Sequence, residues 1–263
     1  MALSLAQRIQ GIRFHETAKR FPAIDKAVVL SPHSDDAAFS IPGTLCQLTA
    51  HHIPVELVTC FSFSAFVKGG RDAAAETITA LRKKEDQRYM ATVGPLCNSI
   101  WLDLRDAPLR GYELSSVCDR NALSRGDFRL VTDIFERVRQ RLFPGSALFV
   151  PLGIGDHVDH RIVHEAGKRF VAEHAHQIIF YEEIPYSLHL PPKRIAQVAQ
   201  RTVHSAGCDT GLIFTAGPNL LSIKVAAAQC YPTQIEPAKA ATILQDARHR
   251  VYLSQERLWE CVI

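Results

Sequence analysis

The stretch that decides the fold is Ala27-Val28-Val29-Leu30-Ser31-Pro32-His33-Ser34-Asp35-Asp36. Its apolar and β-branched first half predicts a buried strand over residues 26–30. The strand ends at once in a proline, followed by a histidine and two carboxylates. Because the carboxyl end of a strand in an open α/β sheet faces the ligand crevice, we expect His33, Asp35 and Asp36 to reach a functional site together.

The spacing of His33 and Asp36 suits one shared cation. Asp36 opens a predicted helix over residues 36–51 and lies three residues after His33, so an imidazole and a carboxylate converge while Asp35 points elsewhere. Taken alone, Asp36 is equally suited to cap its own helix. Two ligands are also too few, because a metal such as zinc takes at least three from the protein.

A second polar cluster follows a later strand. Residues 147–151 predict another buried strand, and the turn after it carries His157, Asp159 and His160. Two parallel strands that end at one edge would bring the two clusters together. His164 lies four residues after His160 on the predicted helix 159–173, so a His-x-x-x-His ligand pair is an open alternative.

The two clusters together carry a family resemblance. Pro-His-x-Asp-Asp after the first strand and His-x-Asp-His after the later one resemble the LmbE/PIG-L family of zinc-dependent de-N-acetylases. The resemblance implies an α/β fold with a Rossmann-like, mostly parallel sheet flanked by helices. It also implies removal of an N-acetyl group from a small substrate that contains an amino sugar, such as an N-acetylglucosaminyl compound.

Site roles follow from this resemblance. The metal ligands that it implies for Zn²⁺, or for another divalent transition metal, are His33, Asp36 and His160. Asp35 would act as the general base. A protonated His157 would stabilise the oxyanion, and Asp159 would accept a hydrogen bond from an imidazole and orient it.

Two further residues are candidates for substrate contact. Arg82 lies on the predicted helix 75–93, in a stretch similar to an Arg-x-x-Glu of the family. The alternative for Arg82 is an ion pair on a solvated helical face. Asp106 lies in a polar loop after the predicted strand 99–102, about where family members place an aspartate that contacts the sugar.

One departure from the family pattern leaves alternatives open. The usual Pro-His-Pro-Asp-Asp-Glu has Ser34 in place of the second proline and Ala37 in place of the glutamate. A non-catalytic, metal-binding relative is therefore one alternative, and a deacylase or amidase acting on a non-sugar N-acyl compound is another. The intact Asp35 and His157 favour a hydrolase over the non-catalytic relative, and the deacylase or amidase stays open because it would use the same residues.

Composition bounds the remaining possibilities. The chain has 263 residues, 47% hydrophobic and 22% charged, which fits one domain over residues 1–263 with a helical lead-in over residues 1–25. A net charge of +3 without basic runs gives no reason to expect nucleic acid. The lead-in has no uninterrupted apolar core, so we expect no membrane span and a cytoplasmic protein. Seven widely spaced cysteines indicate reduced thiols. A homo-oligomer stays open.

The other expected elements complete the α/β pattern. A strand over residues 55–60 follows the first helix, so the first two strands should be parallel. A later strand is expected at 177–181. Amphipathic or apolar patterns predict helices at 128–143, 218–229 and 238–251. Residues 187–217 give no clear pattern.

Overall fold

All the described strands belong to one sheet. The computed structural model describes residues 24–70, 73–173, 176–204, 209–216, 219–236 and 255–262. The strands are β1 (Lys26–Ser31), β2 (Val55–Thr59), β3 (Cys97–Trp101), β4 (Ser146–Pro151), β5 (Gln177–Tyr181), β6 (Asp209–Ala216) and β7 (Gln255–Val262). Their order across the sheet is β3-β2-β1-β4-β5-β7-β6.

Five neighbouring strands of this sheet, from β3 to β5, are parallel. β7 pairs antiparallel with β5 on one side and with β6 on the other. The Rossmann-like, mostly parallel sheet predicted from the sequence is therefore confirmed, including the parallel pairing of the first two strands. β1 lies between β2 and β4, so its carboxyl end lies beside that of β4.

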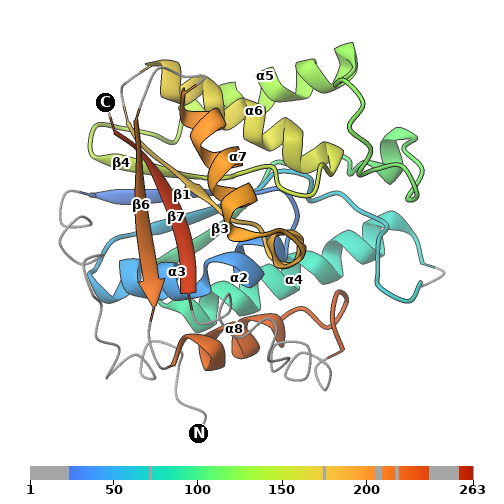
Figure 1. Ribbon diagram of the computed structural model, residues 1–263. Coiled ribbons are helices and arrows are strands. Elements are labelled where there is room, and N and C mark those ends of the chain that lie inside the picture. The colour runs from blue at the N-terminus through green and yellow to red at the C-terminus, as the bar shows by residue number, and fades with distance from the viewer. Residues whose placement is uncertain are drawn as a thin grey trace, which may run out of the picture.

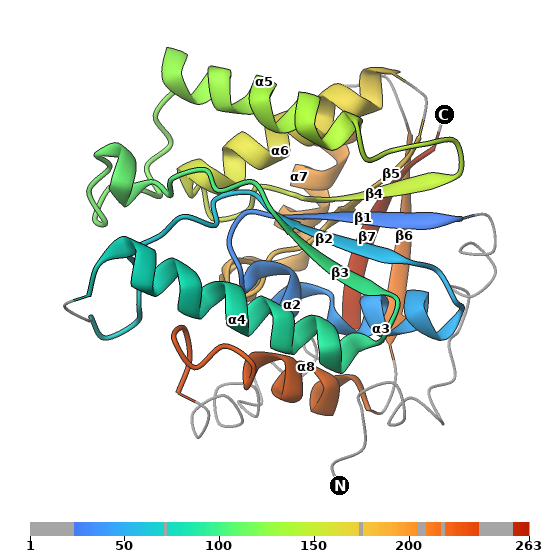
Figure 2. The same cartoon turned by 180° about the vertical axis from the view of Figure 1, so that it is seen from behind.

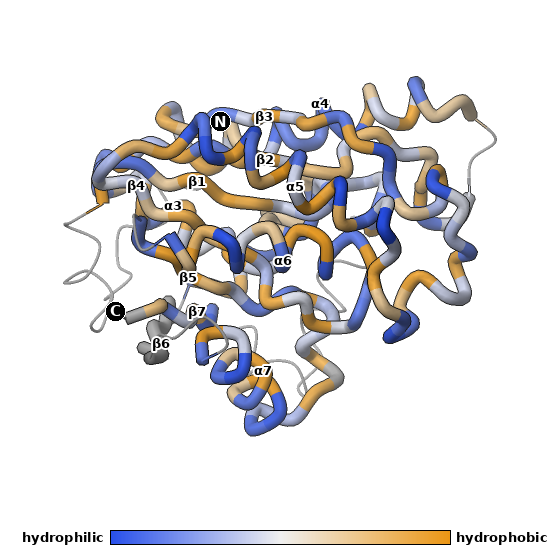
Figure 3. Tube along the Cα trace, turned by 90° about the horizontal axis from the view of Figure 1, so that it is seen from above, coloured by the Kyte–Doolittle hydropathy of each residue, from blue (hydrophilic) through white to orange (hydrophobic). Residues whose placement is uncertain are grey.

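Helices cover both faces of the sheet, as Figures 1 and 2 show. The helices are α2 (Asp36–Ser40), α3 (Pro42–Ala50), α4 (Ala75–Val93), α5 (Arg125–Arg139), α6 (Val158–Glu173), α7 (Pro192–His204) and α8 (Leu220–Ala228). α5 and α6 lie on one face, whereas α2, α3, α4 and α8 lie on the other. Because β1 and β4 are covered on both faces, they are apolar runs rather than alternating patterns (Figure 3).

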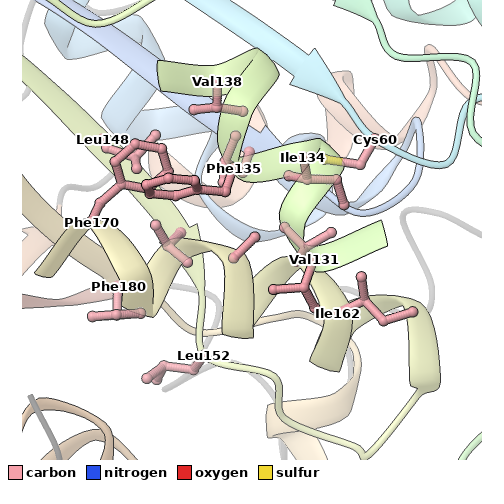
Figure 4. Packing of buried hydrophobic residues seen from close by; sticks show 14 of the residues in the cluster. Cys60, Val131, Ile134, Phe135, Val138, Leu148, Leu152, Ile162, Phe170 and Phe180 are labelled. Carbon is pink, nitrogen blue, oxygen red and sulfur yellow. The ribbon is translucent and has the colours of Figure 1, made fainter. Parts of the chain in front are cut away.

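The core between the sheet and α5 and α6 explains the helical pattern in the sequence. Val131, Ile134 and Val138 of α5 pack in one buried cluster with Phe170 of α6 and Leu148 of β4 (Figure 4). A helix over residues 128–143 was expected, but α5 begins and ends earlier. The earlier start follows from a capping box at Ser124, whose hydroxyl accepts the backbone N–H of the third helical residue.

The expected helix over residues 36–51 is in fact two helices. α2 ends at Ser40, and Ile41 has φ −131° and ψ 36°, which are not helical values. α3 then begins at Pro42, and proline is favoured at a first helical position because its missing N–H is not needed there. The break leaves carbonyls at the end of α2 and N–H groups at the start of α3 without helical partners.

A buried ion pair meets both needs. The ammonium of Lys224 on α8 donates to the backbone carbonyl of Ser40 at 2.9 Å. The carboxylate of Glu256 on β7 accepts the backbone N–H groups of Gly43 at 2.8 Å and Thr44 at 2.7 Å. Lys224 and Glu256 are 3.4 Å apart and both are buried. The late part of the chain therefore fixes the helix break that follows β1.

The remaining expectations divide in three. The strand at 177–181 and the helix at 75–93 are confirmed to the residue, and the helices expected at 159–173 and 218–229 lie within two residues of α6 and α8. The unassigned stretch 187–217 contains α7 and β6, and β7 was not expected. Residues 1–23 of the lead-in predicted over 1–25, and the helix predicted at 238–251, lie outside the described residues. None of the described helices has the length and apolar character that crossing a bilayer requires.

We predict that Glu256→Gln lowers the free energy of unfolding by about 3–5 kcal/mol, because it leaves the buried ammonium of Lys224 without its partner. The measurement is urea unfolding. The matched control is Glu165→Gln, which breaks a half-exposed pair with Lys168 and should cost less than about 1 kcal/mol.

The double variant Lys224→Met with Glu256→Gln should cost less than the sum of the single changes, because no uncompensated charge remains buried. Equal losses of unfolding free energy in Glu256→Gln and Glu165→Gln would contradict the stabilising role of the buried Lys224–Glu256 pair.

Candidate metal centre

The carboxyl ends of β1 and β4 bring the two predicted clusters together. The Asp36 carboxylate lies 3.4 Å from Nδ1 of His33 and 3.3 Å from Nε2 of His160. Ligand atoms of these three residues all lie within 4.8 Å of one another, which is the spacing that a shared metal ion needs. The residues come from the turn after β1, the first turn of α2 and the first turn of α6.

The backbone of the first turn holds Asp36 in place. The backbone N–H of His33 donates to Oδ2 of Asp36 at 2.8 Å, and the hydroxyl of Ser31 donates to the carbonyl of His33 at 2.6 Å. The Asp36 carboxylate therefore folds back onto the turn that carries His33. In the helix-cap alternative, it would bond to the N–H groups of α2 instead.

A glutamate that the sequence analysis did not select orients His160. Oε1 of Glu183, just after β5, lies 3.1 Å from Nδ1 of His160. The same carboxylate accepts the backbone N–H groups of Gly153 at 3.0 Å and Ile154 at 3.1 Å. With the proton on Nδ1, Nε2 of His160 presents a lone pair. This Nε2 atom is buried, and it has no hydrogen-bond partner within the described part of the chain.

Asp159 plays the matching part for His33. Its buried carboxylate lies 2.9 Å from Nε2 of His33 and also accepts the N–H of Ala107 at 2.9 Å and a guanidinium N–H of Arg110 at 2.7 Å. Burial alone would raise the pKa of Asp159, but the bond with His33 and the charge of Arg110 lower it to about 2. The imidazole that the sequence left unspecified for Asp159 is thus His33. Arg110 was not expected at the site.

The electrostatics of the cluster favour a positive charge at its centre. Burial lowers the pKa of His33, but its contacts with Asp159 and Asp36 outweigh this and raise it to about 10. The pKa of His160 is raised, because Asp36 and Glu183 outweigh its burial. The carboxylates thus attract a proton or another cation to the imidazoles. Two imidazoles and one carboxylate, each oriented from outside, form a donor set that fits a divalent transition metal.

Asp35 lies beside this cluster. Its carboxylate lies 3.1 Å from a guanidinium nitrogen of Arg82 and lines the cavity that opens from the centre. Burial raises the pKa of Asp35 against the opposing charge of Arg82. A carboxylate with a raised pKa next to a metal-ligand cluster is suited to accept a proton.

His157 lies over the cluster as a neutral imidazole. Its ring centroid is 5.1 Å from that of His33 and 5.2 Å from that of His160. Burial and the charges of these two rings lower the pKa of His157 to about 3. The backbone N–H of Asp159 donates to Nδ1 of His157 at 3.2 Å, so the proton of the neutral ring is on Nε2. The protonated His157 expected from the sequence is therefore not favoured in this environment.

Arg82 and Asp106 both line the cavity but are buried. Ser64 joins them: its hydroxyl donates to the carboxylate of Asp106 and accepts a guanidinium N–H of Arg82 at 3.3 Å. The alternative to substrate contact for Arg82 was an ion pair on a solvated helical face. Arg82 does form an ion pair, but it is itself buried and its partner is the partly buried Asp35. Ser64 was not expected, since a single serine in a loop has no distinguishing local pattern.

His164 lies outside the cluster. Nδ1 of His164 is 2.9 Å from the backbone carbonyl of Pro151, and its ring packs near Phe180. Among the described residues, two groups have the spacing of metal ligands, namely His33, Asp36 and His160, and His33, His157 and Asp159; neither contains His164. The His-x-x-x-His alternative therefore lacks support from the geometry.

A cavity of about 570 Å³ opens from this centre. The polar residues that line it include His33, Asp35, Asp36 and His157, and its volume is typical of a small-molecule site. Its other walls come from the loop after β2, the segment between β3 and α5, the segment after β5, and the end of α8.

Comparisons with known proteins agree with this geometry. The model of the family described as PIG-L, GlcNAc-PI de-N-acetylase, matches residues 28–171. A 2'-N-acetylparomamine deacetylase of Streptomyces fradiae is 30% identical over 234 residues, which cover 85% of this chain and 78% of that protein.

Two solved structures share the fold. The zinc-inhibited form of the teicoplanin deacetylase Orf2 has a TM-score of 0.65 at 18% identity and covers 90% of this chain and 98% of its own. The N,N'-diacetylchitobiose deacetylase of Pyrococcus horikoshii has a TM-score of 0.61 at 15% identity and covers 91% of this chain and 84% of its own. With more than half of the chain matched by the family model, this protein belongs to the PIG-L family of de-N-acetylases.

Proposed function

We propose that this protein is a zinc-dependent hydrolase that removes the N-acetyl group from an amino-sugar substrate, such as an N-acetylglucosaminyl compound. The observation that carries the proposal is the position of Asp35. This carboxylate pairs with Arg82, is not one of the three candidate ligands, and lines the same cavity as His33 and Asp36. Family membership and a relative named as an N-acetylparomamine deacetylase support the same chemistry.

His33, Asp36 and His160 would hold the metal ion. A divalent ion with this ligand set polarises a carbonyl oxygen and lowers the pKa of water toward neutrality. Asp159 and Glu183 hold the two imidazoles from outside, so the ligand nitrogens are Nδ1 of His33 and Nε2 of His160. Outer hydrogen bonds of this kind fix ring orientation and raise ligand basicity.

Asp35 and His157 would perform the proton transfer and the charge stabilisation. Asp35 accepts a proton from the attacking water as the water oxygen bonds to the amide carbon. Asp35 then gives this proton to the amide nitrogen as the C–N bond breaks, which leaves acetate and the free amine. Nε2–H of His157, rather than a charged ring, donates to the oxyanion of the tetrahedral intermediate.

Ala37, which stands where the family pattern has a glutamate, gives no reason to expect a loss of function. Ala37 is fully buried in the apolar cluster on the α2 side of the sheet, and its N–H donates to the Ser31 hydroxyl at 3.2 Å. The ligand cluster and Asp35 are assembled without a carboxylate at this position. A non-catalytic, metal-binding relative would have no use for Asp35 and His157 in these positions. A deacylase of a non-sugar compound would use the same residues as the proposed de-N-acetylase and would differ from it only in the substrate.

Other expectations stay predictions. We propose that residues 1–263 form one catalytic domain and that Arg82 and Asp106 act at the substrate end of the cavity. From the sequence composition we also propose a cytoplasmic location and no nucleic-acid partner. A homo-oligomer stays possible.

Glu183→Gln should weaken zinc affinity by about 10- to 100-fold, because the amide is a poorer partner for Nδ1 of His160. The measurement is zinc affinity by competition with a chelator, without any activity assay. Glu182→Gln is the matched control, since Glu182 is the chain neighbour, is buried as well, and faces Arg257 instead. Equal affinities of the two variants would remove Glu183 from the proposed metal site.

Asp35→Asn should keep its zinc and lose about 10²- to 10⁴-fold in turnover, because an amide cannot accept the proton of water. The assay measures free amine released from N-acetylated sugars and from N-acyl amines, beside zinc content. Asp133→Asn, on the exposed side of α5, is the control that should change neither. Full turnover by zinc-loaded Asp35→Asn protein would assign the base to another residue.

His157→Ala should retain zinc but lose on the order of 10²- to 10³-fold in kcat, because a hydrogen bond to the oxyanion acts in the transition state. His157→Gln, which keeps an N–H donor, should recover part of this loss. If both variants lose zinc and the pattern of kcat follows zinc content, His157 only positions His160.

A further inference from the structure

The outer walls of the cavity are apolar. Away from the metal centre, its lining includes Phe66, Leu114, Val117, Ile184, Leu188 and Ile235. They come from four separate segments of the chain that meet at the cavity. A pocket with a polar centre and apolar walls selects ligands that have both characters.

Two of these side chains are more exposed than folding requires. Leu114 is 63% exposed and Phe66 is 41% exposed, so neither contributes much to the core. Single exposed apolar side chains are common on protein surfaces. These two, however, line the same cavity together with Ile184, Leu188 and Ile235. Exposed apolar side chains that line one cavity indicate a binding site rather than chance exposure.

The carboxylates of the described lining already have partners. Asp35 contacts Arg82, Asp106 accepts from Ser64, and Asp36 lies between two imidazoles. A substrate with several ammonium groups would thus meet no unengaged carboxylate in the described part of the cavity, whose lining also includes the basic residue Lys68. The walls therefore favour an apolar substituent over a polycationic one.

We propose that the substrate is an amino-sugar conjugate in which an apolar group, alkyl or aryl, is attached to the N-acetylated sugar and lies against Leu114, Phe66 and Ile184. This inference rests on the proposed function and adds the substrate class to it. The sugar places its N-acetyl group at the metal centre, and the apolar group extends along the outer walls.

The test uses methyl, butyl and hexyl glycosides of N-acetylglucosamine, below the concentrations at which they form micelles. With the zinc-loaded enzyme, we expect kcat/KM to rise by about two- to fourfold for each added methylene that reaches the walls, mainly through KM. The zinc-loaded Asp35→Asn variant should show the same rise in affinity by calorimetry, where no turnover is needed.

Variants then locate the effect. Leu114→Ser and Phe66→Ser should each reduce the ratio of hexyl to methyl kcat/KM. Phe128→Ser is the matched control: this side chain is 50% exposed on α5, does not line the cavity, and its loss should leave both the ratio and the basal rate unchanged. Equal ratios in Leu114→Ser, Phe66→Ser and Phe128→Ser would overturn the assignment of the walls.

The two proposals fail in different ways. Equal kcat/KM for all three glycosides would overturn the apolar subsite and leave the de-N-acetylase intact. If no glycoside is hydrolysed but affinity still rises along the series, the subsite is supported and the proposed reaction fails. Tighter binding of the methyl than of the hexyl glycoside would also overturn the subsite.

Discussion

The parallel pairing of β1 with β4 is the constraint on which the site depends. Val29 pairs with Phe149, so the strands end level with one another and deliver His33 and His160 to one edge of the sheet. Both strands are buried on both faces, and a shift of register by one residue would turn every side chain to the opposite face. The packing of the core thereby fixes the distance between the two imidazoles.

Burying so many ionisable groups at one sheet edge is costly unless each is paired. The structure meets this cost by drawing partners from other strand ends. Glu183, which follows β5, contacts His160 at 3.1 Å. Arg110, in the segment after β3, donates to Asp159 at 2.7 Å. Residues that follow β3, β1, β4 and β5, four of the five parallel strands, thus contribute to one charge arrangement.

The ends of the strands could be predicted because their signals lie within a few neighbouring residues. Features that depend on contacts between distant parts of the chain could not be predicted. An apolar run that stops at His33 or before His157 is visible in a few residues, so both clusters and the α/β class follow from the sequence. Glu183 also lies just after a predicted strand, and this position was the one signal in the sequence that could have placed it at the site. The break at Ile41 had a local signal, because Pro42 and Gly43 indicate an irregular turn there. The capping of α3 by Glu256 was not predictable, because Glu256 lies 213 residues from Gly43. The neutral state of His157 likewise depends on the charges of neighbours brought together by folding.

The late part of the chain helps to hold the centre in place, together with the two motifs that supply its ligands. α2, which carries Asp35 and Asp36 at its beginning, has only five residues and is far too short to be stable alone. The Asp36 carboxylate holds its start, and Lys224 holds the carbonyl of Ser40 at its end. Lys224, Glu256 and Glu183 all lie beyond residues 28–171, the span matched by the family model. The motifs supply the reactive groups, but segments outside that span determine where the base and a ligand are held.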